Sequence, residues 1–417
     1  MGEDRSYAGF IKWMAVSLLA GILLTVLFVV VVDPYCLFRL VDIAGVNAVK
    51  PRPDHYQSEI KLAGARALRP ALVLMGNSRV DVGIDPDSPL LGAATRSAYN
   101  LAIPGTGVGT SREQFDQLRS SGAAPATMLL GVDFFDFLLN PDGADAPPKP
   151  PPGWLAGQRW KIDTLFSLDA LLDAVKTLRI QRDPDAGTMT ARGFNPLFDY
   201  LRFAREDGYH SIFRQRALEN ARNFSLAPHG IVRTGGDSSP EWRDLGALLD
   251  AAASERTDVH LVVYPYHAQL MAMMEQAGLW PVFEQWKLRL LREIARLNVA
   301  HPQARIVLWD FSGYGALQCE AIPAKGDLVN GTRWYWESGH FKSALGERML
   351  ERLFGAAPAA PAEFGFRLDA ANADENRARI GRERQACLAA EPAMFREAAA
   401  MVADFQVRQA KNGVAGR

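Results

Sequence analysis

The longest uninterrupted apolar run of the chain lies close to its N-terminus. Residues 14–32 read MAVSLLAGILLTVLFVVVV, 19 residues without a charge, which is long enough for a helix that crosses a bilayer. Lys12 and Trp13 precede the run and Tyr35 follows it, as residues at membrane interfaces do. A signal peptide has a shorter apolar region that ends at small residues, whereas this run ends in four valines before Asp-Pro. A buried core helix is the other alternative. The pattern favours an uncleaved, single-pass helix over residues 13–32.

Shorter apolar runs follow at intervals and alternate with stretches of helical spacing. Each run ends in small or polar residues, which is typical of buried parallel strands. The runs are residues 71–75, 97–101, 127–133, 259–264 and 305–310. Strands separated by helices predict βαβ crossovers and a parallel sheet. We therefore expect an α/β fold whose strand ends gather at one edge, where such sheets bind their ligands.

Changes in composition divide the chain into segments. Residues 1–12 are a short polar head, which we expect in the cytoplasm, and residues 33–69 are a juxtamembrane connector with three prolines. The α/β domain would cover residues 70–355, with an insertion at about residues 140–240 that begins with the stiff sequence PPKPPP. Residues 356–417 are rich in Ala, Arg and Glu. We expect them to form a peripheral helical tail.

Charge and cysteine content argue against nucleic-acid binding and against a zinc or redox site. The 417 residues carry a net charge of −1 with no long basic run, which argues against a nucleic-acid partner. The cysteines Cys36, Cys319 and Cys387 form no CxxC pair, so a zinc or redox motif is not indicated. Cys319 and Cys387 could pair in an oxidising compartment, and three free thiols are the alternative.

The turn after the first strand carries a candidate nucleophile. The sequence GNSR follows residues 71–75 directly, so Ser78 would stand exposed at a strand tip, unless it only caps the turn. A nucleophilic serine needs a base and an acid that orients the base. His340 is the best base, and Glu337 lies three residues before it, just ahead of a helix. The pattern favours a triad in which Ser78 attacks, His340 is base and then acid, and Glu337 orients His340.

Two further residues would lie near the same strand ends. His267 follows the fourth strand by three residues, so it could bind substrate, act as an alternative base, or only close the turn. Arg79 could bind an acidic glycan or a carboxylate. A salt bridge from Arg79 to Asp81 or to another local acid is the structural alternative.

These blocks resemble those of the SGNH, or GDSL-like, hydrolase superfamily over about residues 72–354. Ser78 matches the serine block after the first strand, and Gly105 matches the glycine block after the second. Glu337-Ser-Gly-His340 matches the final block, with Glu in place of Asp, whereas Asp133 stands where an asparagine is usual. The resemblance implies a three-layer α/β/α, flavodoxin-like sheet. It also implies that no metal or diffusible cofactor is needed.

The aspartate at position 133 bears on how an oxyanion would be stabilised. It implies donors at Gly105 and at the Ser78 amide, but an ionised Asp133 aimed at an oxyanion would oppose the reaction. Asp133 would therefore turn away or be protonated, unless it marks a lost activity. The side-chain amides of Asn77 and Asn100 could replace the missing donor.

The apolar helix extends the comparison to a function. The layout resembles membrane-anchored SGNH-like proteins that help to O-acylate cell-surface polymers. This implies a serine-dependent O-acyl (acetyl) transferase or esterase acting on a glycan, held by the inner membrane on its periplasmic side. A multi-span acyltransferase would supply the acyl group as a partner. The alternative is a catalytically weak scaffold that binds a glycan or such a partner.

Overall fold

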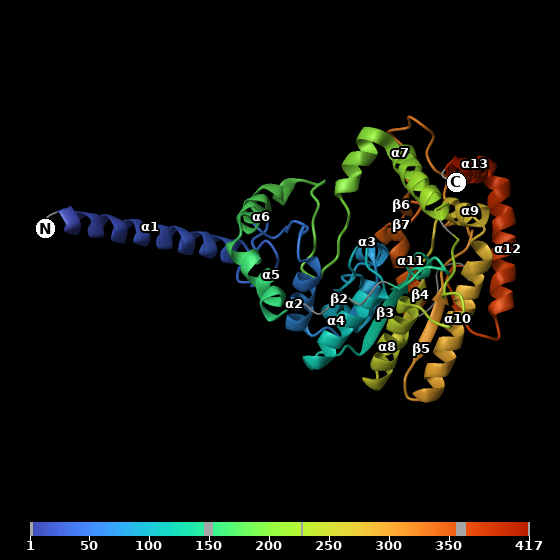
Figure 1. Ribbon diagram of the computed structural model, residues 1–417, viewed down its shortest axis with the longest axis horizontal. Coiled ribbons are helices and arrows are strands. Elements are labelled where there is room, and N and C mark those ends of the chain that lie inside the picture. The colour runs from blue at the N-terminus through green and yellow to red at the C-terminus, as the bar shows by residue number, and fades with distance from the viewer. Residues whose placement is uncertain (1–2, 146–152, 227, 356–363, 416–417) are drawn as a thin grey trace.

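The computed structural model describes residues 3–145, 153–226, 228–355 and 364–415. Helix α1 (Glu3–Val32) extends away from the rest of the molecule as one long rod (Figure 1). Residues Tyr7–Val32 of this helix are long and apolar enough to cross a membrane, and little of their most apolar stretch is covered by protein. The apolar run thus forms a helix that is longer at its N-terminal end than the sequence predicts.

A six-stranded sheet forms the centre of the main domain. Its order is β2-β1-β3-β4-β5-β8, and every neighbouring pair is parallel except β5 and β8. The strands are β1 (Leu72–Met75), β2 (Ala98–Asn100), β3 (Thr127–Val132), β4 (Asp258–Val263), β5 (Ile306–Asp310) and β8 (Phe366–Leu368). All residues of β1 and β2 are buried, so apolar runs without alternation predict these strands. The five predicted strands are confirmed with only small differences at their ends.

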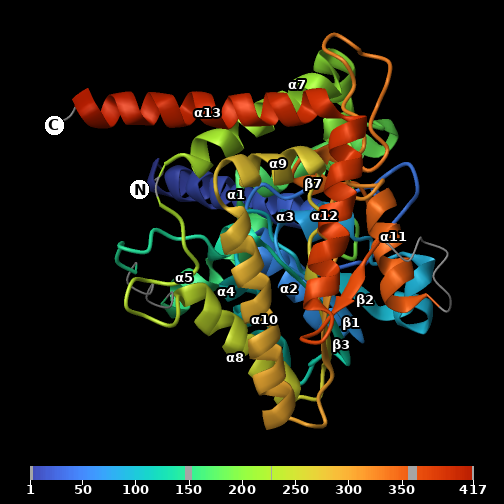
Figure 2. The same cartoon turned by 90° about the vertical axis from the view of Figure 1, so that its right-hand side faces the viewer.

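Helices lie on both sides of this sheet (Figure 2). One side carries α2 (Gln57–Leu68), α4 (Val108–Ser120), α8 (Pro240–Ser254) and α10 (Trp280–Ala300), each packed against the next. On the other side, α11 (Ser343–Phe354) packs against the short α3 (Ser78–Gly83) and a 3₁₀ segment, Pro89–Ser97. A second, two-stranded sheet consists of β6 (Tyr335–Glu337) and β7 (His340–Phe341). Further 3₁₀ turns span Phe134–Phe137 and Ile180–Arg182.

The helices of the insertion pack against two different parts of the molecule. Its helices α5 (Trp154–Phe166) and α6 (Leu168–Arg179) pack against each other and against α1. Its long helix α7 (Asp199–Phe224) instead packs against β6 and against α9 (Ala268–Gln276). The connector is bonded to the insertion, with main-chain hydrogen bonds from Arg52 to Gly187 and from Met189 to Lys50. The insertion therefore joins the end of the apolar helix to the main domain.

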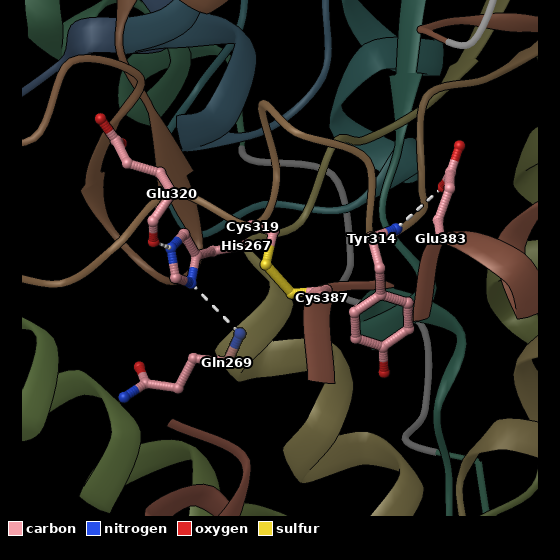
Figure 3. The surroundings of a disulfide bond; sticks show 7 residues. All are labelled: His267, Gln269, Tyr314, Cys319, Glu320, Glu383 and Cys387. Carbon is pink, nitrogen blue, oxygen red and sulfur yellow. Dashed lines mark hydrogen bonds between the residues drawn. A yellow bond between two sulfur atoms is a disulfide. The ribbon is translucent and has the colours of Figure 1, made fainter. Parts of the chain in front are cut away.

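The C-terminal segment is helical, as expected, but it is not peripheral. Its strand β8 completes the sheet, and α12 (Ala373–Ala390) and α13 (Pro392–Ala415) follow. Helix α13 packs against α9 and α7, and its residues Ala398 and Val402 are fully buried. A disulfide joins Cys319 to Cys387 of α12 (Figure 3). Cys36 is a free, half-buried thiol. The prediction of a peripheral tail is therefore wrong, because these helices cover part of the core.

Candidate active site

Ser78 stands at the end of β1 because the chain turns sharply after Met75. Gly76 makes this turn at φ +142°, where a Cβ atom would approach the Tyr264 hydroxyl to 2.7 Å and the Gly131 carbonyl oxygen to 3.0 Å. Only glycine fits there. The side chain of Asn77 then caps α3 by accepting a hydrogen bond of 3.1 Å from the main-chain N–H of Arg79. The serine is thereby presented at the carboxyl edge of the sheet.

The base and its acid come from one hairpin. Glu337 and His340 are paired residues of β6 and β7, joined by Ser338 and Gly339. The His340 Nδ1–H donates to the Glu337 carboxylate, and Ser78 Oγ lies 2.7 Å from His340 Nε2. The structure thus brings all three residues of the predicted triad together. Glu337 and His340 face each other across the two-residue turn of this hairpin.

The environment keeps the acid of this group ionised. Burial by itself raises the pKa of the Glu337 carboxyl. The charge and hydrogen bond of His340, a hydrogen bond of 2.8 Å from the Gly339 N–H and the charge of Arg216 outweigh burial, and they lower this pKa to about 2. A carboxylate in this position fixes the imidazole and stabilises the imidazolium that forms when His340 takes a proton. The arrangement can therefore convert Ser78 into a nucleophile.

Asp133 is bonded to a set of donors beside this triad. Its Oδ2 accepts from Asn77 Nδ2 at 2.8 Å, and its Oδ1 accepts from the Tyr266 hydroxyl at 2.7 Å. The Phe135 N–H donates to Oδ1 at 3.2 Å, and Arg79 forms an ion pair with Oδ2. Four donors on two oxygens suit a carboxylate. Of the two expectations for Asp133, the bonding therefore agrees with a carboxylate engaged elsewhere and not with a neutral acid aimed at the oxyanion.

Arg79 forms a salt bridge, as the structural alternative expects, but Asp81 is not its partner. Arg79 pairs with Asp133, and its guanidinium lies over the aromatic rings of Tyr264 and Tyr266. Asp81 points into the core, where its Oδ1 lies 2.5 Å from the Nζ of Lys61, and both side chains are fully buried. The two carboxylates thus pair with different cations, Asp133 with Arg79 beside the serine and Asp81 with Lys61 in the core.

The two proposed replacement donors are already bonded within the protein. The Asn77 amide donates to Asp133 and to Asp136, and the Asn100 amide donates to two main-chain carbonyl oxygens, of Val80 and Ile84. Both side-chain amides are therefore unavailable to an oxyanion, and this prediction is wrong. Sequence could not reveal it, because the acceptors lie in the segments that follow β1 and β3, and only the fold brings them to these amides.

Two main-chain donors remain beside Ser78. Within the described residues, the N–H groups of Ser78 and Gly105 have no hydrogen-bond acceptor. Both residues line the same cavity, and Gly105 adopts φ +70°, which favours glycine. Their N–H groups are the donors that could stabilise an oxyanion here.

His267 does not reach the triad. It is fully buried at the start of α9, where its Nδ1 accepts from the Gln269 N–H at 3.1 Å and its Nε2–H donates to the Glu320 carbonyl oxygen at 2.8 Å (Figure 3). Burial lowers the pKa of His267 to about 4. Because both ring nitrogens are occupied, the roles of alternative base and substrate ligand are wrong. The structural alternative, a residue that closes the turn, is confirmed.

Ser78 borders two cavities. One, of about 410 Å³, is lined by Gly105 and Asp133 and by Asn220 and Asn223 of α7. The other, of about 320 Å³, contains His340 and is lined by Tyr200 and Arg216, also of α7. No local signal in the irregular insertion predicts these α7 residues, because only the fold carries them to the site.

Within the described residues, no group of three or more His, Cys, Asp and Glu side chains could hold a metal ion. The chain matches no protein-family model, and neither a curated protein nor a solved structure matches it.

Proposed function

We propose that this protein is a membrane-anchored serine esterase or O-acyl (acetyl) transferase that acts on a cell-surface glycan. The observation that carries the proposal is the continuous hydrogen-bonded path from Ser78 Oγ through His340 to the Glu337 carboxylate. A serine, a base and a buried acid in this order are the groups that acyl transfer requires.

The chemistry follows from the position of each group. His340 Nε2 takes the proton of Ser78 as Oγ attacks the carbonyl carbon of an ester. The N–H groups of Ser78 and Gly105 hold the oxyanion. His340 then gives the proton to the leaving alcohol, and an acyl-serine remains. Water or a glycan hydroxyl then attacks the acyl-serine and gives its proton to His340. His340 returns this proton to Ser78 Oγ as the bond between Oγ and the acyl carbon breaks, which releases the free acid or the acylated glycan.

The fold is consistent with the resemblance to SGNH-like hydrolases. The order of the first five strands, 2-1-3-4-5, is the order of flavodoxin-like sheets. Helices on both sides of such a sheet support a three-layer α/β/α domain. In this arrangement Ser78, Gly105 and Asp133 follow the first three strands at the edge where ligands bind.

Two features support a body outside the cytoplasm, on the periplasmic side of an inner membrane. Helix α1 can span a bilayer, and the main domain contains a disulfide between Cys319 and Cys387. Disulfides form and persist in oxidising compartments. A glycan at the cell surface would be within reach there, and a multi-span acyltransferase would bring the acyl group across the membrane.

Labelling with a fluorophosphonate probe tests this proposal. The probe should react with the wild-type protein, and Ser78→Ala should abolish both the labelling and the release of acetate from an O-acetylated polysaccharide. Ser120→Ala, at an exposed serine of α4, is the matched control and should label normally. A wild-type protein that does not label, or a Ser78→Ala variant that labels as well as wild type, would favour the scaffold alternative.

A further inference from the structure

Large apolar side chains are exposed around the point where α1 meets the main domain. Outside α1, more than half of the exposed large apolar residues in the described chain come from residues 38–46 and 155–178. We call the most exposed of them the apolar collar, defined as Leu40, Ile43, Leu155, Ile162, Phe166, Leu168 and Leu172. Exposed apolar surface gathered in one region marks an interaction site.

The collar belongs to ordered helices and not only to a loop. Leu155, Ile162 and Phe166 are spaced by seven and four residues along α5, so they share one face of that helix. On α6, Leu172 is exposed, whereas Ala170 and Ala174 are fully buried against α1. Helix α6 therefore packs with its alanines, and the side that it leaves uncovered carries Leu172 beside the exposed Asp169 and Lys176.

The packing of α6 against α1 fixes the depth of the collar. The uncharged run of 19 residues that ends at Val32 is about 28 Å long as a helix, which nearly equals the hydrocarbon thickness of about 30 Å. Val29 and Val32 then lie at the outer edge of the hydrocarbon. They pack in one cluster with Ala170 and Ala174, so α6 must lie at the same depth.

The charge that precedes the apolar run opposes any other placement. Moving α1 outward by two turns would lift α6 out of the membrane, but it would draw Lys12 into the hydrocarbon, where a charge is costly. Helices that lie in an interface expose an apolar face beside polar residues. Arg159 shares the exposed face of α5 with Leu155 and Ile162, and its long side chain can keep the charge at the headgroups while the apolar side chains enter the hydrocarbon.

We infer that the apolar collar is immersed in the outer leaflet of the bilayer that α1 spans. The occupant of this surface is lipid, because the surface is continuous with the membrane-spanning helix. The inference rests on the membrane anchoring in the proposed function and not on the proposed chemistry. It implies that three segments besides α1, which are the connector, α5 and α6, hold the main domain at a fixed height and tilt above the membrane.

Depth-dependent quenching in lipid-only nanodiscs tests this. The full chain, with Cys36→Ser, would be reconstituted in phosphatidylethanolamine and phosphatidylglycerol. A single cysteine would be introduced as Ile162→Cys, Phe166→Cys or Leu172→Cys and labelled with a nitrobenzoxadiazole fluorophore. Leu23→Cys in α1 is the positive control. Val299→Cys on α10, where the native side chain is 83% exposed, is the negative control. Circular dichroism would check that each variant is folded.

Lipids brominated near the headgroup end of the chain should quench the collar labels several-fold more than the Val299→Cys label. Collar labels that behave like Val299→Cys while Leu23→Cys is quenched would overturn the collar and leave the anchor intact. If Leu23→Cys is not quenched either, both the anchor and the collar are wrong. The collar labels could instead stay in water in nanodiscs while the same cysteines, unlabelled, resist thiol reagents in native membranes. That result would show that a protein partner covers this face, and it would overturn the inference that lipid does.

Discussion

The disulfide between Cys319 and Cys387 should account for a large part of the stability of the main domain. It links the segment after β5 to α12, with a sequence separation of 68 residues and a Cα–Cα distance of 5.8 Å. The chain-entropy relation for a loop of this length gives about 4 kcal/mol at 25 °C, from the freedom that the bond removes from the unfolded chain. This is a substantial fraction of the roughly 5–15 kcal/mol that stabilises a typical folded protein.

The neighbourhood of the bond connects it to the hairpin of the site. Glu320, next to Cys319, accepts a hydrogen bond from His267 at its main-chain oxygen. Its carboxylate accepts from the Trp334 N–H at 3.0 Å, immediately before β6. Loss of the disulfide should therefore loosen the segment that positions the hairpin, and fluorophosphonate labelling of Ser78 should slow before the protein unfolds.

Urea unfolding of the full chain in detergent, followed by tryptophan fluorescence, measures the effect. The double variant Cys319→Ser/Cys387→Ser should lose about 4 kcal/mol of unfolding free energy, and reductant should affect wild type in the same way. The Cys36→Ser variant, which keeps the disulfide, is the control and should behave as wild type. Equal unfolding free energies for oxidised and reduced wild type would refute the reasoning, as would three reactive thiols in the unreduced, denatured protein.

Three substitutions probe the site and its surroundings. Glu337→Gln should present an amide N–H to His340 and favour the wrong tautomer, so kcat should fall by about 10³–10⁴-fold, the scale of the same change in a serine-protease triad; an unchanged kcat would exclude the acid role. Asp133→Asn should leave Arg79 without its buried partner, at a cost of about 3–5 kcal/mol in urea unfolding together with slower turnover. Full activity and stability in this variant would instead indicate a protonated Asp133. Burial lowers the pKa of His267 to about 4. Between about pH 4 and 6.5 the imidazole is therefore protonated in the unfolded chain but not in the folded protein. Stability should therefore fall by about 3 kcal/mol as pH drops from about 6.5 to 4, and His267→Asn, which keeps a capping oxygen, should remove that slope.

Strands β1, β2 and β3 are predictable from sequence because they are buried on both faces. Runs such as residues 71–75 contain apolar residues without alternation, and they end at glycine or aspartate. The C-terminal helices give no such signal. Seven of the 18 residues of helix α12 are charged, and its few buried residues, among them Ile380 and Cys387, are too sparse to produce a clear apolar stripe. Its place beside the core depends on the disulfide and on distant contacts.

The triad is predictable for a similar reason, whereas its surroundings are not. Ser78 follows a strong strand signal, and Glu337 and His340 are close in sequence. The partner of Arg79 lies 54 residues away, at Asp133, and local sequence favours the nearer Asp81. Pairings of this kind are decided by the turn geometry at each strand end, which single-sequence patterns do not contain.

The hairpin that holds both Glu337 and His340 divides the assembly of the site into a local and a remote part. The contact between these two residues spans 3 positions, whereas the contact between Ser78 and His340 spans 262. The acid–base pair can therefore form as soon as its hairpin closes, but the serine stays inactive until almost the whole domain has been synthesised and folded. If the body crosses the membrane as an unfolded chain, a serine esterase of the kind proposed would first become reactive on the far side, and acyl esters inside the cell would be spared during export.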